Sequence, residues 1–313
     1  LGKTVTLTGA ALSGTDAGNY SLSSVSTTTA NITAKSVVPS IVADDKIHDT
    51  TTTATLSSQS LTGVLAPDVV NLVVGVANFA DEDVGIWTVT GSSLSLSGAD
   101  AANYTLSAPT ATDTASITAR NLTISGAVAQ NKTYDGDTVA TVDFSGASLT
   151  GVLGVDLVTI DSIGCTANFG DENVGNGKPV TVLGVALSGT DAANYTVSQP
   201  AGLAANITPL GITGSFTAEN KIYDGTTAAA VTGRFLTGVV GEDDVTLTGG
   251  TAAFADRNVG TGKTVTLTGA ALSGTDAGNY SLSSVGTTTA NITAKSVVPS
   301  IVADDKIYDT TTT

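Results

Sequence analysis

Acidic side chains gathered in short turns are the residues that could most directly bind a metal ion. Asp81, Glu82 and Asp83 are consecutive, and Asp171 and Glu172 occupy the matching place further along the chain. Carboxylate oxygens are the ligands that Ca²⁺ prefers in proteins, so these five residues are calcium candidates. The third such turn contains Arg257, whose positive charge would repel a cation. We therefore expect no cofactor, and calcium at the acidic turns is kept as the alternative.

A catalytic centre is not expected, because the residue types for one do not occur together. The chain contains one histidine, His48, and one cysteine, Cys165. A lone histidine makes neither a metal cluster nor a histidine-dependent triad, and no nucleophile, base and orienting group recur as a set. His48 also stands where other copies of its motif have tyrosine, so we interpret it as a tolerated variant. The sequence thus predicts a protein that is not an enzyme.

A lysine-led motif recurs along the chain and sets its organisation. Its copies begin at Lys46, Lys132, Lys221 and Lys306, which lie 86, 89 and 85 residues apart. We interpret each copy as a short strand, an aromatic anchor and a turn, because Asp-Gly suits a turn with positive φ. The structural residues singled out in this motif are Lys46, Tyr134, Asp135, Tyr223, Asp224 and Tyr308. Some bacterial sandwich domains join a lysine to an asparagine or aspartate side chain, and the recurring lysines leave such a cross-link open.

A second motif places a tyrosine four residues after an aspartate. It occurs at Tyr20, Tyr104, Tyr195 and Tyr280. In immunoglobulin-like sandwiches, a tyrosine at such a corner hydrogen-bonds to upstream backbone, and its ring fills the end of the core. We expect the same structural role here. Antibody domains have a cysteine two residues later, whereas this chain has Leu22, Leu106, Val197 and Leu282 at that place.

The segments between these motifs are typical of β-strands. Threonine alternates with apolar residues, as in 264–268, which indicates a strand with one buried face. Within one unit we expect strands at 212–218, 227–236, 245–254, 264–272 and 290–294, separated by glycine- and aspartate-rich turns. No stretch shows a helical period with caps. The predicted fold is all-β, a tandem array of small Ig-like antiparallel β-sandwich domains forming an extended rod.

The predicted domain boundaries fall just after each recurring Ala-x-Ile-Thr strand. Whole repeats are expected at 36–120, 121–209 and 210–295, with the C-terminal part of a repeat at 1–35 and the N-terminal part of another at 296–313. A flexible linker would be a long Gly/Ser tract, and none separates the repeats. Residues 1–53 match 261–313 at all but three positions. We therefore expect a semi-rigid rod excerpted from a longer array.

Charge and composition exclude several kinds of partner. The net charge is −16, the opposite of the basic face that nucleic acids or an anionic membrane surface would attract. No apolar run approaches the roughly 18 residues that a membrane span needs. A single cysteine cannot form a disulfide within the chain, which fits an exported protein that does not rely on bridges. Aromatic residues are only 4% of the chain and Trp87 is the sole tryptophan, which weighs against a ring-lined glycan- or protein-binding surface.

Together, the Lys-x-Tyr-Asp-Gly motif, the Asn-Tyr pair and the closing Ala-Asn-Ile-Thr strand resemble the YDG/MBG domains, the "mostly bacterial Ig-like" repeats of large secreted bacterial adhesins. The resemblance covers almost the whole chain, although Asp49-Thr50 and Asp309-Thr310 lack the motif glycine. It implies an extracellular or bacterial cell-surface location and a structural stalk or spacer of an adhesin or fibre. The partners would be neighbouring repeats, other copies in a fibre, and a host or matrix ligand. A self-associating filament or biofilm-matrix protein is one alternative, and a glycan- or protein-binding module is another.

Overall fold

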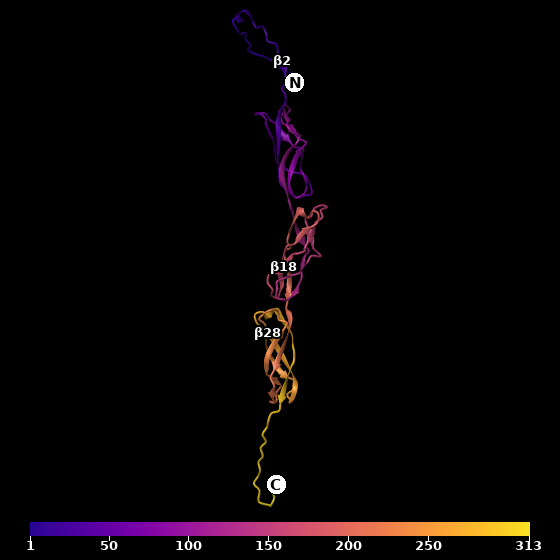
Figure 1. Ribbon diagram of the computed structural model, residues 1–313, viewed down its shortest axis with the longest axis vertical. Coiled ribbons are helices and arrows are strands. Elements are labelled where there is room, and N and C mark those ends of the chain that lie inside the picture. The colour runs from indigo at the N-terminus through magenta and orange to yellow at the C-terminus, as the bar shows by residue number, and fades with distance from the viewer. The chain divides into compact units, whose positions relative to one another are not determined.

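The computed structural model describes residues 1–313 and is built from β-strands, with four single-turn 3₁₀ segments and no α-helix (Figure 1). Strands β1 to β11 cover Lys3–Val5, Thr28–Ala30, Lys35–Ala43, Lys46–Ile47, Leu56–Thr62, Asn71–Val73, Val76–Phe79, Gly85–Ser92, Ser95–Ser97, Tyr104–Leu106 and Ala111–Thr118. Strands β12 to β22 cover Arg120–Ser125, Val128–Ala129, Lys132–Thr133, Val142–Asp143, Ser148–Thr150, Thr159–Asp161, Thr166–Phe169, Gly175–Leu183, Ala186–Ser188, Tyr195–Ser198 and Leu203–Thr208. Strands β23 to β30 cover Leu210–Ala218, Lys221–Ile222, Ala228–Ala229, Val231–Thr237, Thr246–Phe254, Gly260–Ser273, Tyr280–Val285 and Thr288–Thr293. The 3₁₀ segments η1 to η4 cover Ala17–Asn19, Ala101–Asn103, Ala192–Asn194 and Ala277–Asn279.

Contacts divide the chain into two compact units. Unit 1 comprises Leu1–Ile124, Leu149–Asp161 and Ala186–Ser198, and unit 2 comprises Ser125–Ser148, Ser162–Val185 and Gln199–Thr313. The first complete repeat therefore lies in unit 1 and the third lies in unit 2, while the second repeat contributes strands to both. Neither unit contains a helix of the length and hydropathy that a membrane crossing needs.

The first repeat, in unit 1, is a sandwich of two small sheets. One sheet has the order β10-β3-β5 and the other β4-β11-β8-β7. Alternate residues of β3 are buried, so one face of the strand points into the core, as the alternating sequence predicts. Ile41 of β3 packs in one cluster with Phe79 and Val89 of the facing sheet. Aliphatic residues and one or two rings thus fill the core.

The third repeat, in unit 2, has the same plan. Its sheets have the orders β26-β23-β29 and β24-β30-β28-β27-β25. Phe216 of β23 packs with Phe254 of β27 and Val265 of β28, the 14-residue strand labelled in Figure 1. The second repeat supplies sheet β16-β12-β21 and the two-stranded sheet β17-β20 to unit 1, and sheet β14-β22-β19-β18 and the two-stranded sheet β13-β15 to unit 2. The prediction of an all-β fold is confirmed. Small sheets with the same strand order also recur along the chain.

Most strand pairings are antiparallel, as predicted, but parallel pairings recur at one place in each repeat. The first strands of each repeat pair in parallel with its last strands: β3 with β10, β4 with β11, β12 with β21, β14 with β22, β23 with β29 and β24 with β30. The reason lies in the chain path. The chain enters a repeat at one end and leaves it at the other, so its first and last strands run in the same direction.

The turn of the lysine motif keeps one conformation with or without its glycine. Gly136 and Gly225 have φ values of 83° and 80°, and Thr50 and Thr310 follow closely at 64° and 65°. A residue with a Cβ atom is strained in this left-handed region by about 1–2 kcal/mol. The absence of glycine at Asp49-Thr50 therefore costs stability without changing the turn type.

Candidate functional site at the repeat junctions

Each motif lysine closes its own turn. In the third repeat, Lys221 Nζ lies 2.8 Å from Asp224 Oδ1 and donates to the Thr226 carbonyl oxygen at 2.9 Å. The ammonium group also lies 5.6 Å from the centre of the Phe254 ring, within reach of a cation–π attraction. The hydrogen bond from Lys221 lowers the pKa of the Asp224 carboxyl to about 2. The same ion pair joins Lys46 to Asp49, Lys132 to Asp135 and Lys306 to Asp309.

This arrangement bears on the cross-link alternative. The carboxylate that meets each lysine is three residues away in the same turn, and the Asp224 side chain is 53% exposed. A cross-link of the kind considered needs the lysine beside a buried partner and an assisting carboxylate. The motif lysines instead donate to their own turn, and Lys46, Lys132 and Lys221 also lie over a phenylalanine ring, so we infer that they stabilise the turn.

The hydroxyl groups of the corner tyrosines bond to backbone amides that lie far upstream in the sequence. Tyr104 Oη accepts a hydrogen bond from the Leu65 amide at 3.1 Å and donates one to Asp68 Oδ2 at 2.6 Å. Tyr195 repeats this with the Leu153 amide at 3.1 Å and with Asp156 at 2.7 Å. The amide lies 39 residues upstream in the first case and 42 in the second. Each tyrosine therefore ties the turn that follows its 3₁₀ segment to a separate loop of the same repeat.

We use the name socket for three residues of each complete repeat: this aspartate, the tyrosine, and the asparagine that precedes the tyrosine. The sockets are Asp68, Asn103 and Tyr104; Asp156, Asn194 and Tyr195; and Asp243, Asn279 and Tyr280. Burial raises the pKa of the Tyr195 and Tyr280 hydroxyls, and the neighbouring carboxylate raises it further. At Tyr104 the hydrogen bond to Asp68 is the first cause of a raised pKa.

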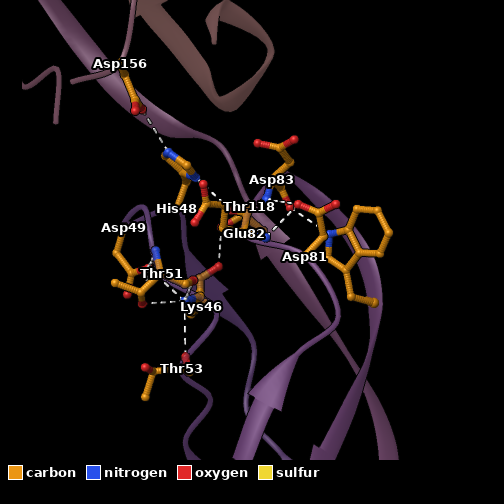
Figure 2. Close-up of polar contacts among 11 residues, drawn as sticks. Lys46, His48, Asp49, Thr51, Thr53, Asp81, Glu82, Asp83, Thr118 and Asp156 are labelled. Carbon is orange, nitrogen blue, oxygen red and sulfur yellow. Dashed lines mark hydrogen bonds and ion pairs between the residues drawn. The ribbon is translucent and has the colours of Figure 1, made fainter. Parts of the chain in front are cut away.

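Junction 1 joins the first repeat to the socket of the second, within unit 1. His48 is only 2% exposed, and its Nε2 lies 3.1 Å from Asp156 Oδ2. Its Nδ1 lies 3.0 Å from the Glu82 carbonyl oxygen. Figure 2 shows the imidazole between these two oxygens, beyond the turn that Lys46 closes. The ring also meets the Tyr195 ring edge-on, with centroids 5.4 Å apart.

Both imidazole nitrogens of His48 face oxygen acceptors, so only the doubly protonated ring donates to both. The hydrogen bond from Tyr195, together with that from His48, holds the pKa of the Asp156 carboxyl below its usual range. A His–Asp pair invites a catalytic interpretation. Yet His48 is buried, and each of its nitrogens lies within hydrogen-bond distance of an oxygen of the protein itself. The ring links two repeats.

The socket asparagine adds a second link to junction 1. Asn194 Oδ1 accepts a hydrogen bond from the Val84 amide at 2.8 Å, and Asn194 Nδ2 donates to Asp83 Oδ1 at 2.7 Å. Asn194 is 5% exposed, so these bonds are sheltered from water. A buried side-chain amide without hydrogen-bond partners there would lower the stability by about 1–3 kcal/mol. The acidic turn of one repeat is thereby fixed to the corner of the next.

Junction 2 joins the second repeat to the socket of the third, within unit 2. Tyr134 is 4% exposed and donates to Asp243 Oδ2 at 2.8 Å, and the Tyr280 hydroxyl donates to the same oxygen. The two tyrosine rings meet edge-on with centroids 5.3 Å apart. Asn279 Oδ1 accepts from the Val174 amide at 2.9 Å, as Asn194 does in junction 1. Burial and the hydrogen bond to Asp243 raise the pKa of the Tyr134 hydroxyl strongly.

The acidic turns serve as hydrogen-bond acceptors for the protein itself. Asp81 Oδ1 accepts from the Glu82 amide at 2.7 Å and the Asp83 amide at 3.2 Å. Asp171 Oδ1 accepts from the Asn173 amide at 2.9 Å and pairs with Lys178. Glu172 is half-buried beside it. No group of three or more potential ligands that could hold a metal ion occurs anywhere in residues 1–313. The Asp81 and Asp171 carboxylates accept hydrogen bonds within their own turns.

The remaining motif tyrosines lie at exposed places. Tyr223 is 36% exposed, and Tyr20 and Tyr308 are 74% and 88% exposed. Tyr20 follows η1 as the other corner tyrosines follow their 3₁₀ segments. Tyr308 lies in 296–313, which contains no strand. These three side chains are therefore not buried in a junction of the kind described above.

The roles of the socket aspartates and asparagines were not predicted from the sequence. Asp68, Asp156 and Asp243 each stand seven residues after the leucine of a Leu-Thr-Gly-Val segment, so a fixed spacing marked them. The asparagines were visible as part of the Asn-Tyr pair. What the sequence did not show was the pairing partner, because His48 and Asp156 are 108 residues apart.

The recurring geometry agrees with the comparison to known families. The family model of the YDG domain matches residues 33–112, 118–202 and 207–290. No curated protein and no solved structure matches the chain. Each matched segment holds one lysine motif and one socket.

Proposed function

Because the chain belongs to the YDG domain family, with three tandem repeats, we propose that it is a structural stalk or spacer of a bacterial surface adhesin or extracellular fibre. The observation that carries this proposal is the repeated junction. A ring from one repeat is buried against the aspartate and tyrosine of the next in both junctions. The geometry that recurs along the chain therefore joins one repeat to the next.

The connections between repeats support the same role. One residue separates β11 from β12, and one separates β22 from β23. Such a short connection leaves little freedom, and the buried ring removes more of it. We propose that the junctions resist bending, so that the chain holds whatever it carries at a distance from its anchor. Its work would be positional and non-enzymatic, at an extracellular or cell-surface location.

The acidic character of the chain suits this role. A net charge of −16 keeps neighbouring stalks apart and soluble. Trp87, the residue most suited to stacking on a ligand, donates from its indole Nε1 to the Asp83 carbonyl oxygen at 2.7 Å and so supports the turn at junction 1. A host or matrix ligand would then be met by other parts of the assembly.

Small-angle X-ray scattering of the chain tests the stalk. A compact globule of this length would have a radius of gyration of about 20 Å. We expect at least twice that value and a narrow cross-section. Replacing both socket aspartates, Asp156→Ala with Asp243→Ala, should broaden the distance distribution because both junctions loosen. Asp16→Ala, at a corner without a side-chain cap bond, is the control. A radius near 20 Å for the wild-type chain would refute the stalk.

A further inference from the structure

Each complete repeat holds the strand of its lysine motif against its own last strand. In the third repeat β24 pairs in parallel with β30, so that Lys221 lies opposite Ile292. β4 pairs in the same way with β11, and β14 with β22. We propose that this parallel pair is a clamp that keeps each repeat folded when the chain is pulled along its length. The inference goes beyond the positional role proposed above, because it makes every repeat an element that bears tension.

The direction of the two strands decides how tension acts on them. A pull on the chain draws the lysine strand backwards, toward the start of the repeat, and draws the last strand forwards. Because the strands run parallel, their pulled ends lie at opposite ends of the pair, and the strands must slide past each other. The evenly spaced hydrogen bonds of the parallel pair are then loaded together. In an antiparallel pair both pulled ends would lie at one end, and the bonds would open one after another.

Three further hydrogen bonds strengthen this short pair. In the third repeat, Asn220 Oδ1 accepts from the Asn291 amide at 2.6 Å. The Tyr223 amide donates to the Thr293 carbonyl oxygen at 2.8 Å, and Thr293 Oγ1 donates to the Lys221 carbonyl oxygen at 3.3 Å. All three bonds connect residues 220–223 with the last strand. A slide of one strand along the other therefore breaks them together with the bonds of the pair.

The same three bonds occur in the other two repeats. In the first repeat they join Asp45 to the Ser116 amide at 2.6 Å, the Thr118 hydroxyl to the Lys46 carbonyl oxygen at 3.2 Å, and the His48 amide to the Thr118 carbonyl oxygen at 2.9 Å (Figure 2). In the second repeat they join Asn131 to the Asn206 amide at 2.7 Å, the Thr208 hydroxyl to the Lys132 carbonyl oxygen at 3.2 Å, and the Tyr134 amide to the Thr208 carbonyl oxygen at 2.9 Å. Every one of these bonds lies inside a single repeat, so the clamp does not depend on the junctions.

The clamp is also shielded from water and fixed on its outer side. The isoleucine opposite the motif lysine is at most 2% exposed in all three repeats. Lys221 Nζ donates to the Ala228 carbonyl oxygen at 2.9 Å, and Ala228 belongs to β25, at the far edge of the same sheet. The backbone of β24 is thus held by β30, while its lysine side chain is held by β25. Peeling β24 away would break the lysine contacts as well.

Constant-force measurements on single molecules test the clamp, since the unfolding rate governs forced unfolding. The full chain, held at its two ends, should show one unfolding step for each complete repeat. Thr293→Val removes the hydroxyl bond of the clamp. The matched control is Thr248→Val, which removes a bond of the same length, 3.3 Å, between β27 and β28 of the same repeat.

The two variants should differ only under load. Valine keeps the strand preference of threonine, and urea unfolding should show a similar small loss of stability in both. We expect Thr293→Val to shorten the lifetime of one unfolding step about fivefold, the factor that corresponds to one hydrogen bond of about 1 kcal/mol. Thr248→Val should leave the lifetimes of all steps unchanged, because its bond does not lie between the pulled strands.

A change in the direction of the pull gives a second test. In a Cys165→Ser background, handles on Thr246→Cys and Ser273→Cys, an exposed facing pair of β27 and β28, load that pair at one end. At the same force we expect a lifetime shorter by at least about tenfold, because the bonds break one at a time. Equal lifetimes in the two directions would overturn the clamp, and so would a Thr293→Val lifetime no shorter than that of Thr248→Val. Either result would leave the extended shape measured by scattering intact, so the stalk and the clamp can fail separately.

Discussion

Junctions 1 and 2 share one frame but use different rings. In both, a socket aspartate accepts from a corner tyrosine and from a ring of the preceding repeat, and an asparagine binds a backbone amide beside it. His48 divides its hydrogen bonds between Asp156 and the Glu82 carbonyl of its own repeat. Tyr134 gives its one hydroxyl hydrogen to Asp243. The socket therefore accepts a flat ring with a donor on its edge, and the choice of ring sets whether that ring hydrogen-bonds to the aspartate alone or also to its own repeat.

The largest expected difference follows from removing that aspartate. Asp243→Ala leaves the Tyr134 and Tyr280 hydroxyls without their acceptor in a buried place, at about 1–3 kcal/mol for each group. Asp156→Ala leaves one hydroxyl and one imidazole nitrogen, and His48 keeps its bond to Glu82. We expect hydrogen exchange at the Val174 amide to accelerate more in Asp243→Ala than exchange at Val84 does in Asp156→Ala. Equal acceleration would show that the ring identity has no influence on the junctions.

Alkaline pH should separate the junctions next. Burial followed by the neighbouring aspartate raises the pKa of Tyr134 and Tyr280 in junction 2, and of Tyr195 in junction 1. A raised tyrosine pKa means that the folded state favours the neutral hydroxyl. The stabilisation is thus complete below the unfolded value of about 10 and is lost as the pH rises through the folded-state pKa. Junction 2 has two such hydroxyls, so it should open first.

Absorbance at the tyrosinate band checks this order. Tyr134→Phe and Tyr195→Phe each remove one buried hydroxyl, so the difference spectra assign the late-titrating steps to a junction. Tyr20→Phe, which removes a hydroxyl from an exposed ring outside both junctions, should leave the late-titrating steps unchanged. If the late-titrating steps of Tyr134→Phe are the same as those of the wild-type chain, the contact of Tyr134 with Asp243 is not formed in solution.

The turns beneath the two rings give a smaller contrast. Thr50 holds a φ of 64° below His48, where Gly136 holds 83° below Tyr134. Thr50→Gly should therefore stabilise the first repeat by about 1 kcal/mol, since glycine adopts this region without Cβ strain. Gly136→Thr should destabilise the second repeat by more, because a Cβ there would lie 2.8 Å from Val240 Cγ1. Urea unfolding of both variants measures the two changes, and a loss of stability in Thr50→Gly would contradict the strain argument.

The local features of the fold could be predicted from the sequence, whereas the contacts between repeats could not. The alternation that predicted β23 and β27, the Asp-Gly turn and the corner tyrosines depend on neighbours within a few residues, so a single motif reveals them. The parallel pairing of β3 with β10 depends on where the chain enters and leaves a repeat, which no local pattern encodes. Asp156 was overlooked because its partners, His48 and Tyr195, come from two different repeats. Long-range recurrence of aspartate at one spacing was the available signal.

The smallest expected effect is the exchange of one ring for the other. His48→Tyr would let a phenol donate to Asp156 as Tyr134 donates to Asp243, at the loss of the bond to the Glu82 carbonyl. That carbonyl lies in a turn near the surface, where water can replace the imidazole, so the net cost should stay below about 1 kcal/mol. Trp87 reports on the exchange, because its indole is bonded to Asp83 next to the junction. The urea concentration at the midpoint of its fluorescence change should move little in His48→Tyr. It should move much further in His48→Ala, which leaves the socket empty. A large shift in His48→Tyr would show that the first socket is shaped for imidazole alone, and that the two junctions are not variants of one joint.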